Sequence, residues 1–232
     1  LWTMTASSVR TRVRAEMIAE IKAIAKRHLA TDGTNLSLRA VTRELGMVSS
    51  AVYRYFASRD ELLTALQIDA YNELGDAIDA ADAGVPANDH RGRWIAVGRE
   101  LRTWADAHQP EWALLYGPPA PGYKAPDETV EPSMRPIRVA GQILADAVAA
   151  GALRPTPGER LSRNTREEVA RLRETFFPVL PEPVVFRLLT AWATVFGSIG
   201  FELFGRSGPP LLDPAAIVEH QLTEMADYMG LR

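Results

Sequence analysis

Apolar residues recur at helical spacing along almost the whole chain. In the N-terminal part, a largely apolar stripe advances by three and four positions and ends before Gly33; its members are Val13, Met17, Ile21, Ile24 and His28. This spacing places the stripe on one face of a helix. We find no run that alternates between apolar and polar residues as a half-buried strand does, and no internal repeat. The pattern therefore predicts an all-α protein.

Two short helices joined by a glycine turn are expected next. Ser37 is suited to cap the first, and Gly46 follows at the position where a helix end takes a left-handed turn. The second should span residues 49–56. The residues expected to face inward are Leu38, Val41, Leu45, Ala51, Val52 and Phe56.

Longer helices are expected in the rest of the chain. Ser58 and Glu61 form a capping box that opens a helix reaching about residue 83, and Asp89 can cap a helix that reaches about residue 108. A short helical piece and a proline-rich loop follow. Four more helices are expected at residues 132–150, 163–177, 183–204 and 214–229.

Neither a membrane span nor a secretory segment is expected. The most apolar segment, residues 188–201, is shorter than the ~20 residues that a spanning helix needs, which favours a buried helix. The first residues lack the apolar core of a signal peptide. The chain has no cysteine, which excludes disulfides, thiolate nucleophiles and cysteine-type zinc sites. We expect a cytoplasmic protein.

The acidic overall balance hides a basic N-terminal part. Residues 1–60 carry ten Arg or Lys and five Asp or Glu, a net +5; the rest carries sixteen and twenty-four, a net −8, and the sum is −3. A basic module on an acidic body favours binding of a polyanion. A chance fluctuation of charge is the alternative, and the motif must decide between them.

Three short helices with a glycine turn between the second and third describe a helix-turn-helix. The third helix has an apolar side that holds it on the second. Hydroxyl groups and a guanidinium on its other side suit groove edges and phosphates. These residues are Ser49, Ser50, Tyr53 and Arg54, with Tyr55 at the flank. Arg59, at the start of the next helix, lies where a cation and free backbone N–H groups can meet a phosphate.

Three strings in this region, "AIAKRHLATDG", "LSLRAVTRELGM" and "SSAVYRYFASRDELL", carry a family pattern of turn and aromatic spacing. Residues 14–66 resemble the tetracycline-repressor (TetR) family of transcriptional regulators. The later run "WALLYGPPAPGY" resembles a subgroup with a Tyr/Phe-Gly-x-Pro-x-Pro-Gly-Tyr element in the ligand domain. Two residues depart from the family pattern: Thr42 replaces an alanine and Val48 replaces a capping serine.

The resemblance implies a role for each matching residue. Ser50 and Tyr53 would face the groove, and Tyr55 and Arg59 would bind backbone phosphates. Ser37 and Arg39 would touch phosphate from the second helix, and Arg54 would reach a base or a phosphate. Some alternatives stay open: core packing for Tyr53, a solvated surface position for Arg54, and either a DNA-tracking arm or a disordered tail for Arg10, Arg12 and Arg14.

The last two helices are apolar on more than one side, which requires more than one packing partner. Pairing with the same helices of a second copy would make a four-helix dimer bundle, and a monomer core is the alternative. The expected interface residues are Phe186, Leu189, Trp192, Phe196, Val218, Leu222 and Met225.

A ligand pocket is expected where aromatic residues accompany the glycine- and proline-rich run of residues 112–123. Such a loop leaves backbone groups that no helix satisfies, and they can serve as polar points among aromatic walls. The expected pocket residues are Trp104, Trp112, Tyr116, Tyr123, Phe177 and Trp192. For most of them a plain hydrophobic core is the alternative.

The sequence therefore predicts a helix-turn-helix DNA-binding domain, residues 1–60, and a larger helical domain for ligand binding and dimerisation, residues 61–232. The predicted function is a TetR-type regulator, most simply a repressor, which binds a palindromic operator as a homodimer and is released by a small, mostly apolar effector. The high ratio of arginine to lysine is typical of a GC-rich bacterial genome. No catalytic residue, metal or cofactor is expected. A non-regulatory DNA-binding protein and an enzyme with an incidental helix-turn-helix are the alternatives.

Overall fold

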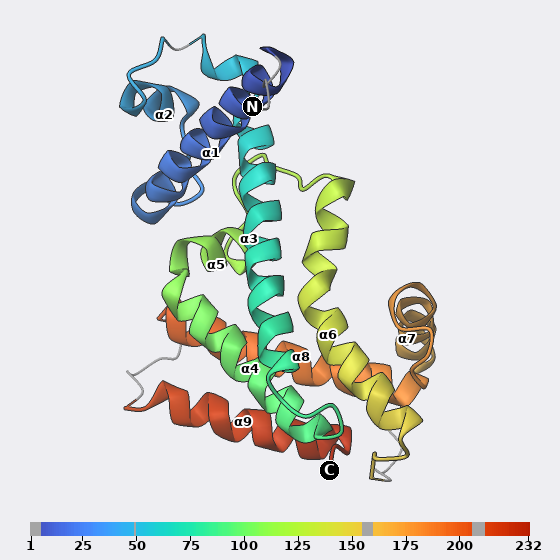
Figure 1. Cartoon of the computed structure of the whole chain (residues 1–232). Coiled ribbons are helices and arrows are strands. Elements are labelled where there is room, and N and C mark those ends of the chain that lie inside the picture. Colours follow the sequence, from blue (N-terminus) through green and yellow to red (C-terminus); the bar gives the residue numbers. More distant parts are fainter. Residues whose placement is uncertain (1–5, 49, 155–159, 206–211) are drawn as a thin grey trace. The chain divides into compact units, whose positions relative to one another are not determined.

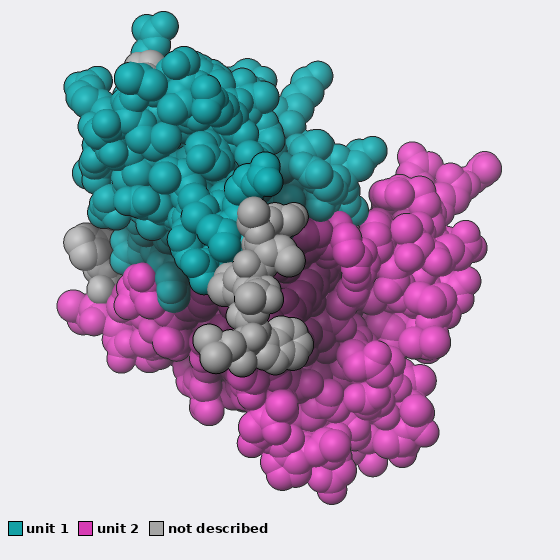
Figure 2. All heavy atoms as spheres, turned by 45° about the horizontal axis from the view of Figure 1, so that its top comes forward, with its two compact units in different colours: residues 1–70, 108–130 teal, residues 71–107, 131–232 magenta. Residues whose placement is uncertain are grey.

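The computed structural model describes residues 6–48, 50–154, 160–205 and 212–232 (Figure 1). Within these ranges every regular element is a helix, which confirms the predicted all-α fold. The chain forms two compact units (Figure 2). Unit 1 comprises the described residues up to Ala70 together with His108–Val130, and unit 2 comprises Tyr71–Ala107 and the described residues from Glu131 onward. The compact units divide the chain after Ala70, Ala107 and Val130, and the functional boundary expected after residue 60 stays a prediction.

Unit 1 is built around a shared apolar core. Its elements are α1 (Ala6–Asp32), α2 (Leu38–Glu44), the 3-10 turn η1 (Val52–Arg54), the first part of α3 (Arg59–Ala83), α5 (Gln109–Tyr116) and the 3-10 turn η2 (Asp127–Thr129). Buried side chains from α1, α2, η1, α3, α5 and the loop after α5 meet in this core, among them Ile21, Val41, Val52, Leu63, Leu114 and Ala120. The segment after residue 107 is therefore part of the unit that contains the predicted helix-turn-helix.

The helix ends in unit 1 follow the sequence prediction. Ser37 Oγ accepts a hydrogen bond from the backbone N–H of Ala40 at 3.4 Å, which caps α2. Ser58 Oγ accepts from the N–H of Glu61 at 3.1 Å, and the carboxylate of Glu61 accepts from the N–H of Ala57 at 2.5 Å. Gly46 closes α2 with φ of 65°, in the left-handed region that glycine enters without steric cost.

The predicted helix over residues 49–56 is wrong in its extent. Ser49 lies outside the described residues. Among residues 50–56 only Val52–Arg54 is helical, and it forms one 3-10 turn. The backbone N–H groups of Ala51, Arg54 and Tyr55 each bond to the carbonyl three residues earlier. β-branched and aromatic residues are poor helix formers, and so short a segment gains little from its own hydrogen bonds.

The N-terminal arginines form neither an arm nor a tail. Arg10, Arg12 and Arg14 all lie within α1, which begins at Ala6. Arg12 forms an ion pair of 3.5 Å with Glu16 on the next turn, a spacing that supports a helix. A flexible arm and a disordered tail are therefore both wrong, and contact of these arginines with DNA is a separate question that the helix leaves open.

Unit 2 holds the second part of α3 and the helices α4 (His90–Ala107), α6 (Val130–Ala149), α7 (Arg163–Phe176), α8 (Glu182–Leu203) and α9 (Pro214–Met229). The helix α9 packs against both α8 and α4. Its contact with α4 is made at a glycine, since a Cβ on Gly98 would lie 2.0 Å from a methyl carbon of Leu222. The indole N–H of Trp94 donates to the carbonyl of Leu222 at 2.9 Å, so α4 and α9 pack closely.

One described helix, α8, is long and apolar enough by length and composition to cross a membrane, although the core helix of a soluble protein passes the same test. Its buried side chains recur at helical spacing: Val184, Val185, Leu188, Ala191, Val195 and Ile199. Phe201, on the other side, is 57% exposed. The expectation of a buried helix is therefore met on one side of α8 only.

A buried arginine joins three elements of unit 2. The guanidinium of Arg93 on α4 donates to both carboxylate oxygens of Asp82, at 2.7 and 2.9 Å, and to Asp146 on α6 at 2.8 Å. Burial opposes the ionisation of Asp146, but hydrogen bonds from Arg93 and Gln142 outweigh it, so the pKa of Asp146 lies below its ordinary value. The ion pairs of Arg93 with Asp82 and Asp146 therefore stabilise the fold most at a pH where Asp146 is ionised.

Replacing Arg93 with methionine leaves the two carboxylates without their shared cation. We expect Arg93→Met to lower the free energy of unfolding by about 2–3 kcal/mol at pH 7, less than a fully buried pair because Asp146 is 37% exposed. Because the folded-state pKa of Asp146 is depressed, the stability it contributes is lost as the pH falls through that value, and the penalty shrinks. Denaturant unfolding at neutral and acidic pH measures both effects.

Arg99→Met is the matched control, because the ion pair of Arg99 with Glu219 is largely exposed. Exposed pairs contribute about 0–1 kcal/mol. If both variants lower the free energy of unfolding equally at pH 7, the buried ion pairs of Arg93 contribute no more stability than an exposed pair.

Candidate nucleic-acid interface

Side chains that the sequence predicts to contact DNA gather around one hollow on unit 1, of about 450 Å³. It is lined by Leu36, Ser37, Leu38, Arg39, Tyr53, Ala57, Ser58 and Arg59. These residues come from the N-terminal ends of α2 and α3 and from η1. Helix N-termini present unpaired backbone N–H groups and the positive end of the helix dipole, so two of them beside two arginines form a setting for anions.

The exposed side chains of η1 point away from the core. Tyr53 is 49% exposed, whereas Val52 and Phe56 are 1% and 5% exposed. Core packing is therefore wrong for Tyr53, because its neighbours fill the core. Ser50 and Arg54 are exposed as well, and the choice between base and phosphate for Arg54 stays open.

Arg59 is held in place by its own unit. One of its terminal nitrogens donates to the backbone carbonyl of Thr34 at 2.5 Å, and the other lies 3.4 Å from a carboxylate oxygen of Asp60. The side chain is 28% exposed. A guanidinium fixed in this way offers its remaining N–H groups at a defined position, which sequence reasoning could not foresee because Thr34 lies twenty-five residues earlier.

Tyr55 is paired with an arginine that the predicted site omits. The guanidinium of Arg14 lies over the ring of Tyr55, 5.3 Å from its centroid, and donates to the backbone carbonyl of Arg54 at 3.0 Å. A cation over an aromatic face is attracted by the ring. The only signal in the sequence is the group of N-terminal arginines, which gives no partner for any of them.

The two departures from the family pattern are accommodated. Thr42 is buried, and its hydroxyl donates to the backbone carbonyls of Leu38 and Arg39, each at 3.0 Å. Its extra polar group is therefore satisfied inside α2. Val48 is 73% exposed and leaves the core unchanged.

A carboxylate ties α2 to α1. Glu44 accepts from Arg27 at 2.6 Å and pairs with the ring of His28 at 2.7 Å. The hydrogen bond from Arg27, followed by that from His28, lowers the pKa of Glu44 below its ordinary value. This contact connects the C-terminal end of α2 with α1, in addition to the apolar core.

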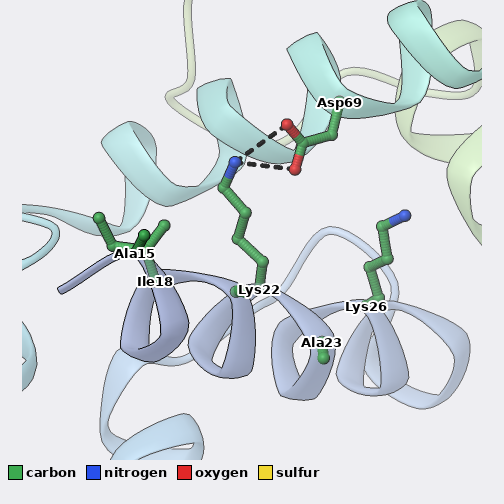
Figure 3. Close-up of a pocket in the computed structure, with 7 residues that line it drawn as sticks. Ala15, Ile18, Lys22, Ala23, Lys26 and Asp69 are labelled. Carbon is green, nitrogen blue, oxygen red and sulfur yellow. Dashed lines mark hydrogen bonds and ion pairs between the residues drawn. The ribbon is translucent and has the colours of Figure 1, made fainter. Parts of the chain in front are cut away.

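A second hollow of unit 1 lies along α1 and is lined by Ala15, Ile18, Ala19, Lys22, Ala23, Lys26 and Asp69 (Figure 3). Lys22 Nζ on α1 lies 2.9 and 2.8 Å from the two carboxylate oxygens of Asp69 on α3. This ion pair joins α1 to α3. No group of three His, Cys, Asp or Glu in the described part of the chain is placed to hold a metal ion.

The six aromatic residues predicted to bind a ligand divide between the units. Trp112, Tyr116 and Tyr123 belong to unit 1, and Trp104, Phe177 and Trp192 belong to unit 2. In unit 1 the Trp112 and Tyr116 rings lie 4.6 Å apart, and the hydroxyl of Tyr123 is bonded to α3. In unit 2 Trp104 and Phe177 are buried and Trp192 is half-buried. Ligand binding by these residues stays a prediction.

The residues predicted to form a dimer interface also fall into two groups. Half-buried in the single chain are Phe186, Leu189, Trp192, Phe196 and Met225. Val218 and Leu222 are only 3% and 1% exposed, so they belong to the interior of unit 2 and cannot contribute an interface surface. Two further apolar residues of these helices, Phe201 and Ile217, are 57% and 41% exposed and line a hollow between α8 and α9.

Comparison with known proteins agrees with these observations. The model of bacterial regulatory proteins of the tetR family matches residues 21–66, and the model of the tetracyclin repressor-like C-terminal domain matches residues 94–225. The chain is 39% identical over 211 residues to the HTH-type transcriptional regulators Mb1846 of Mycobacterium bovis and Rv1816 of Mycobacterium tuberculosis, covering 90% of this chain and 90% of each relative. It is similar in structure to SCO4313, with a TM-score of 0.73 and 33% identity over 94% of this chain and 98% of that one.

The link between α1 and α2 is testable through the titration of one carboxyl group. We expect NMR titration to give Glu44 a pKa below its ordinary value, and Arg27→Gln to move it back towards that value, since the hydrogen bond from Arg27 is the main cause of the shift. Glu131, whose pKa is lowered by Arg138 instead, is the internal control and should not move. If the pKa of Glu44 is unchanged in Arg27→Gln, the hydrogen bond between Arg27 and Glu44 is not formed in solution.

Proposed function

This chain belongs to the tetR family of bacterial regulatory proteins, and we propose that it is a ligand-responsive transcriptional repressor acting in the cytoplasm. It binds a palindromic operator as a homodimer and releases it when a small, mostly apolar effector binds. The observation that carries the proposal is the hollow of unit 1, where Ser37, Arg39, Tyr53 and Arg59 meet at two helix N-termini. Helix N-termini, hydroxyl groups and guanidinium groups are among the usual partners of DNA phosphates.

On the DNA, Ser50 and Tyr53 read the groove, with Ser49 beside them in the sequence. Ser37, Arg39, Tyr55 and Arg59 hold backbone phosphates. Ser50 is exposed, and Ser37, Arg39, Tyr53 and Arg59 surround the hollow. Tyr55 is half-buried next to η1, and its support is the basic charge of this part of the chain. Phosphate contacts fix the register on the duplex, and contacts to base edges specify the sequence.

The homodimer is formed by the uncovered apolar face of α8 and α9. Phe201 and Ile217 are its most exposed members, and the half-buried residues Phe186, Leu189, Trp192, Phe196 and Met225 extend it. Apolar surface of this kind favours burial against a second copy, and a two-fold pair presents two identical DNA-binding modules to a palindrome. Val218 and Leu222 are left out because they already pack inside the single chain.

The effector binds among aromatic residues of unit 2, of which Trp104 and Phe177 are buried and Trp192 is half-buried. Phe177 packs close to the backbone of α6, because a Cβ on Gly141 would lie 2.8 Å from its ring. A coupling free energy of about 1–3 kcal/mol between effector and operator changes operator affinity ~5–150-fold, provided that the effector prefers one state of the protein.

Selection from random duplex DNA tests the function. We expect the full chain to enrich a discrete palindromic site, whereas a non-regulatory DNA-binding protein enriches sequences broadly and an enzyme enriches none. Arg59→Ala should weaken binding to all sequences and reduce the salt slope by about one unit, because one phosphate contact is lost. Tyr53→Ala should weaken the selected site ~10–100-fold while changing random DNA little.

Arg171→Ala, an exposed arginine of α7 in unit 2, is the matched control and should leave both affinities and the salt slope unchanged. Wild-type binding by Arg59→Ala and Tyr53→Ala across the whole salt range would place the DNA-binding surface elsewhere.

The dimer is tested by charging its most exposed residues. Phe201→Glu and Ile217→Glu should give folded monomers in sedimentation experiments, because an unpaired charge in an apolar interface costs several kcal/mol while the monomer buries neither residue fully. Leu222→Glu should instead unfold the protein, since Leu222 is 1% exposed.

Val179→Glu is the control, because Val179 is 71% exposed and lies outside α8 and α9. It should remain dimeric. If Phe201→Glu and Ile217→Glu sediment as intact dimers, the two-fold contact uses another face of the molecule.

A further inference from the structure

The glycine- and proline-rich segment is built into the DNA-binding unit. Leu114 and Ala120 are 8% and 6% exposed and belong to the same core cluster as Leu62, Leu63 and Leu66 of α3. α5 also packs against α1, and Lys26 of α1 lies 3.8 Å from Glu111 of α5. The residues from Gln109 to Tyr123 therefore cover part of the core that supports the predicted DNA-contacting elements.

Tyr123 fastens this segment to α3 by hydrogen bonds. Its hydroxyl donates to Gln67 Oε1 at 2.7 Å and lies 2.9 Å from Thr64 Oγ1. Because the tyrosine proton is committed to Gln67, Thr64 donates in the second bond. Gln67 Nε2 in turn donates to the backbone carbonyl of Leu114 at 3.3 Å, so both ends of the Gln67 amide are used by this one segment.

The environment keeps the Tyr123 hydroxyl protonated. Burial raises the pKa of Tyr123, and the nearby carboxylates of Asp60 and Glu128 act in the same direction. Thr64 is 6% exposed, so its hydroxyl has little access to water if the tyrosine oxygen is removed. If the Tyr123 hydroxyl is removed, the buried Thr64 hydroxyl loses its hydrogen-bond partner. This costs more free energy than the loss of a hydrogen bond exposed to water.

The residues that bond to Tyr123 lie on α3, the helix whose first residue is Arg59. Arg59 lies five positions before Thr64 on that helix, and its guanidinium reaches back to Thr34. The Lys22–Asp69 ion pair ties α1 to α3 further along (Figure 3). Each of α1, α3 and the segment is therefore in contact with the other two, and these contacts limit how far any one of them can move relative to its partners.

We propose that Tyr123 is a positioning residue for DNA binding, which with Thr64 and Gln67 latches residues 109–123 onto α3 and so fixes the Arg59 end of that helix against α1. The proposal rests on the proposed function, because it assigns the latch a role in operator binding. The segment is continuous at one end with α4 and at the other with α6, both of unit 2.

The test uses the full-length Tyr123→Phe variant, which removes the hydroxyl and keeps the ring. At a temperature where circular dichroism shows the variant fully folded, we expect its affinity for the selected operator to fall about tenfold, as for loss of a hydrogen bond with a buried partner. The salt slope should stay that of the wild type, because no phosphate contact is removed. A merely structural role would lower the melting temperature and leave operator affinity unchanged.

Two further variants sharpen the result. Thr64→Val should also weaken operator binding, and the double variant should be little weaker than Tyr123→Phe alone, because Tyr123→Phe already removes the bond to Thr64. Tyr228→Phe makes the same chemical change in α9 of unit 2 and should bind operator like the wild type. Operator binding within twofold of the wild type for Tyr123→Phe, or an equal loss in Tyr228→Phe, would overturn the proposal.

Hydrogen exchange of the free protein separates this proposal from the proposed function. Tyr123→Phe should speed amide exchange in residues 109–123 and in the first turns of α3. If the wild type selects no discrete DNA site, the proposed function fails, and exchange still decides on the latch: faster exchange supports it, and unchanged exchange refutes it.

Discussion

The structure depends on one uninterrupted helix, α3, whose buried side chains serve both compact units. Leu62, Leu63 and Leu66 lie in the core of unit 1, at 0–1% exposure, and Leu74 and Ile78, both fully buried, lie in unit 2. The first turn of α3 borders the candidate DNA site in unit 1 and its later turns pack in unit 2, so one helix contributes to both units.

Unit 1 is better described as a supported helix-turn-helix than as an isolated three-helix module. Its DNA-facing surface is short, since η1 is a single turn, and its position depends on contacts with residues distant in sequence. Arg14 steadies Tyr55, Thr34 steadies Arg59, and Glu44 joins α2 to α1. Preorganisation of this kind reduces the entropy lost when side chains are ordered on a ligand.

The sequence reveals the features that rest on local chemistry. Caps at Ser37, Ser58 and Asp89, and the left-handed Gly46, follow from hydrogen bonds and backbone sterics within a few residues, and all four are present. The helical spacing of apolar residues likewise predicts the first and last residues of the unit 2 helices to within about two positions. These elements need no knowledge of tertiary contacts.

The remainder depends on partners that the pattern of apolar residues does not identify. Periodicity shows that α9 is apolar on several sides, but not that Leu222 faces Gly98 of the same chain while Ile217 stays exposed. Backbone groups of the loop before Tyr123 suggested a pocket, but the pattern did not reveal that the Tyr123 hydroxyl is bonded to Thr64 and Gln67, more than fifty positions away. The extent of η1 was overestimated because helical spacing says nothing about stability in so short a segment.

We propose that this chain binds DNA through the face of unit 1 that surrounds Ser37, Tyr53 and Arg59. Hydrogen exchange of the full chain, with and without the selected duplex, tests it most directly. We expect the duplex to slow exchange at residues 34–40 and 50–62 and to leave α7 unchanged. Slower exchange confined to unit 2, with no change in these two segments, would contradict the account.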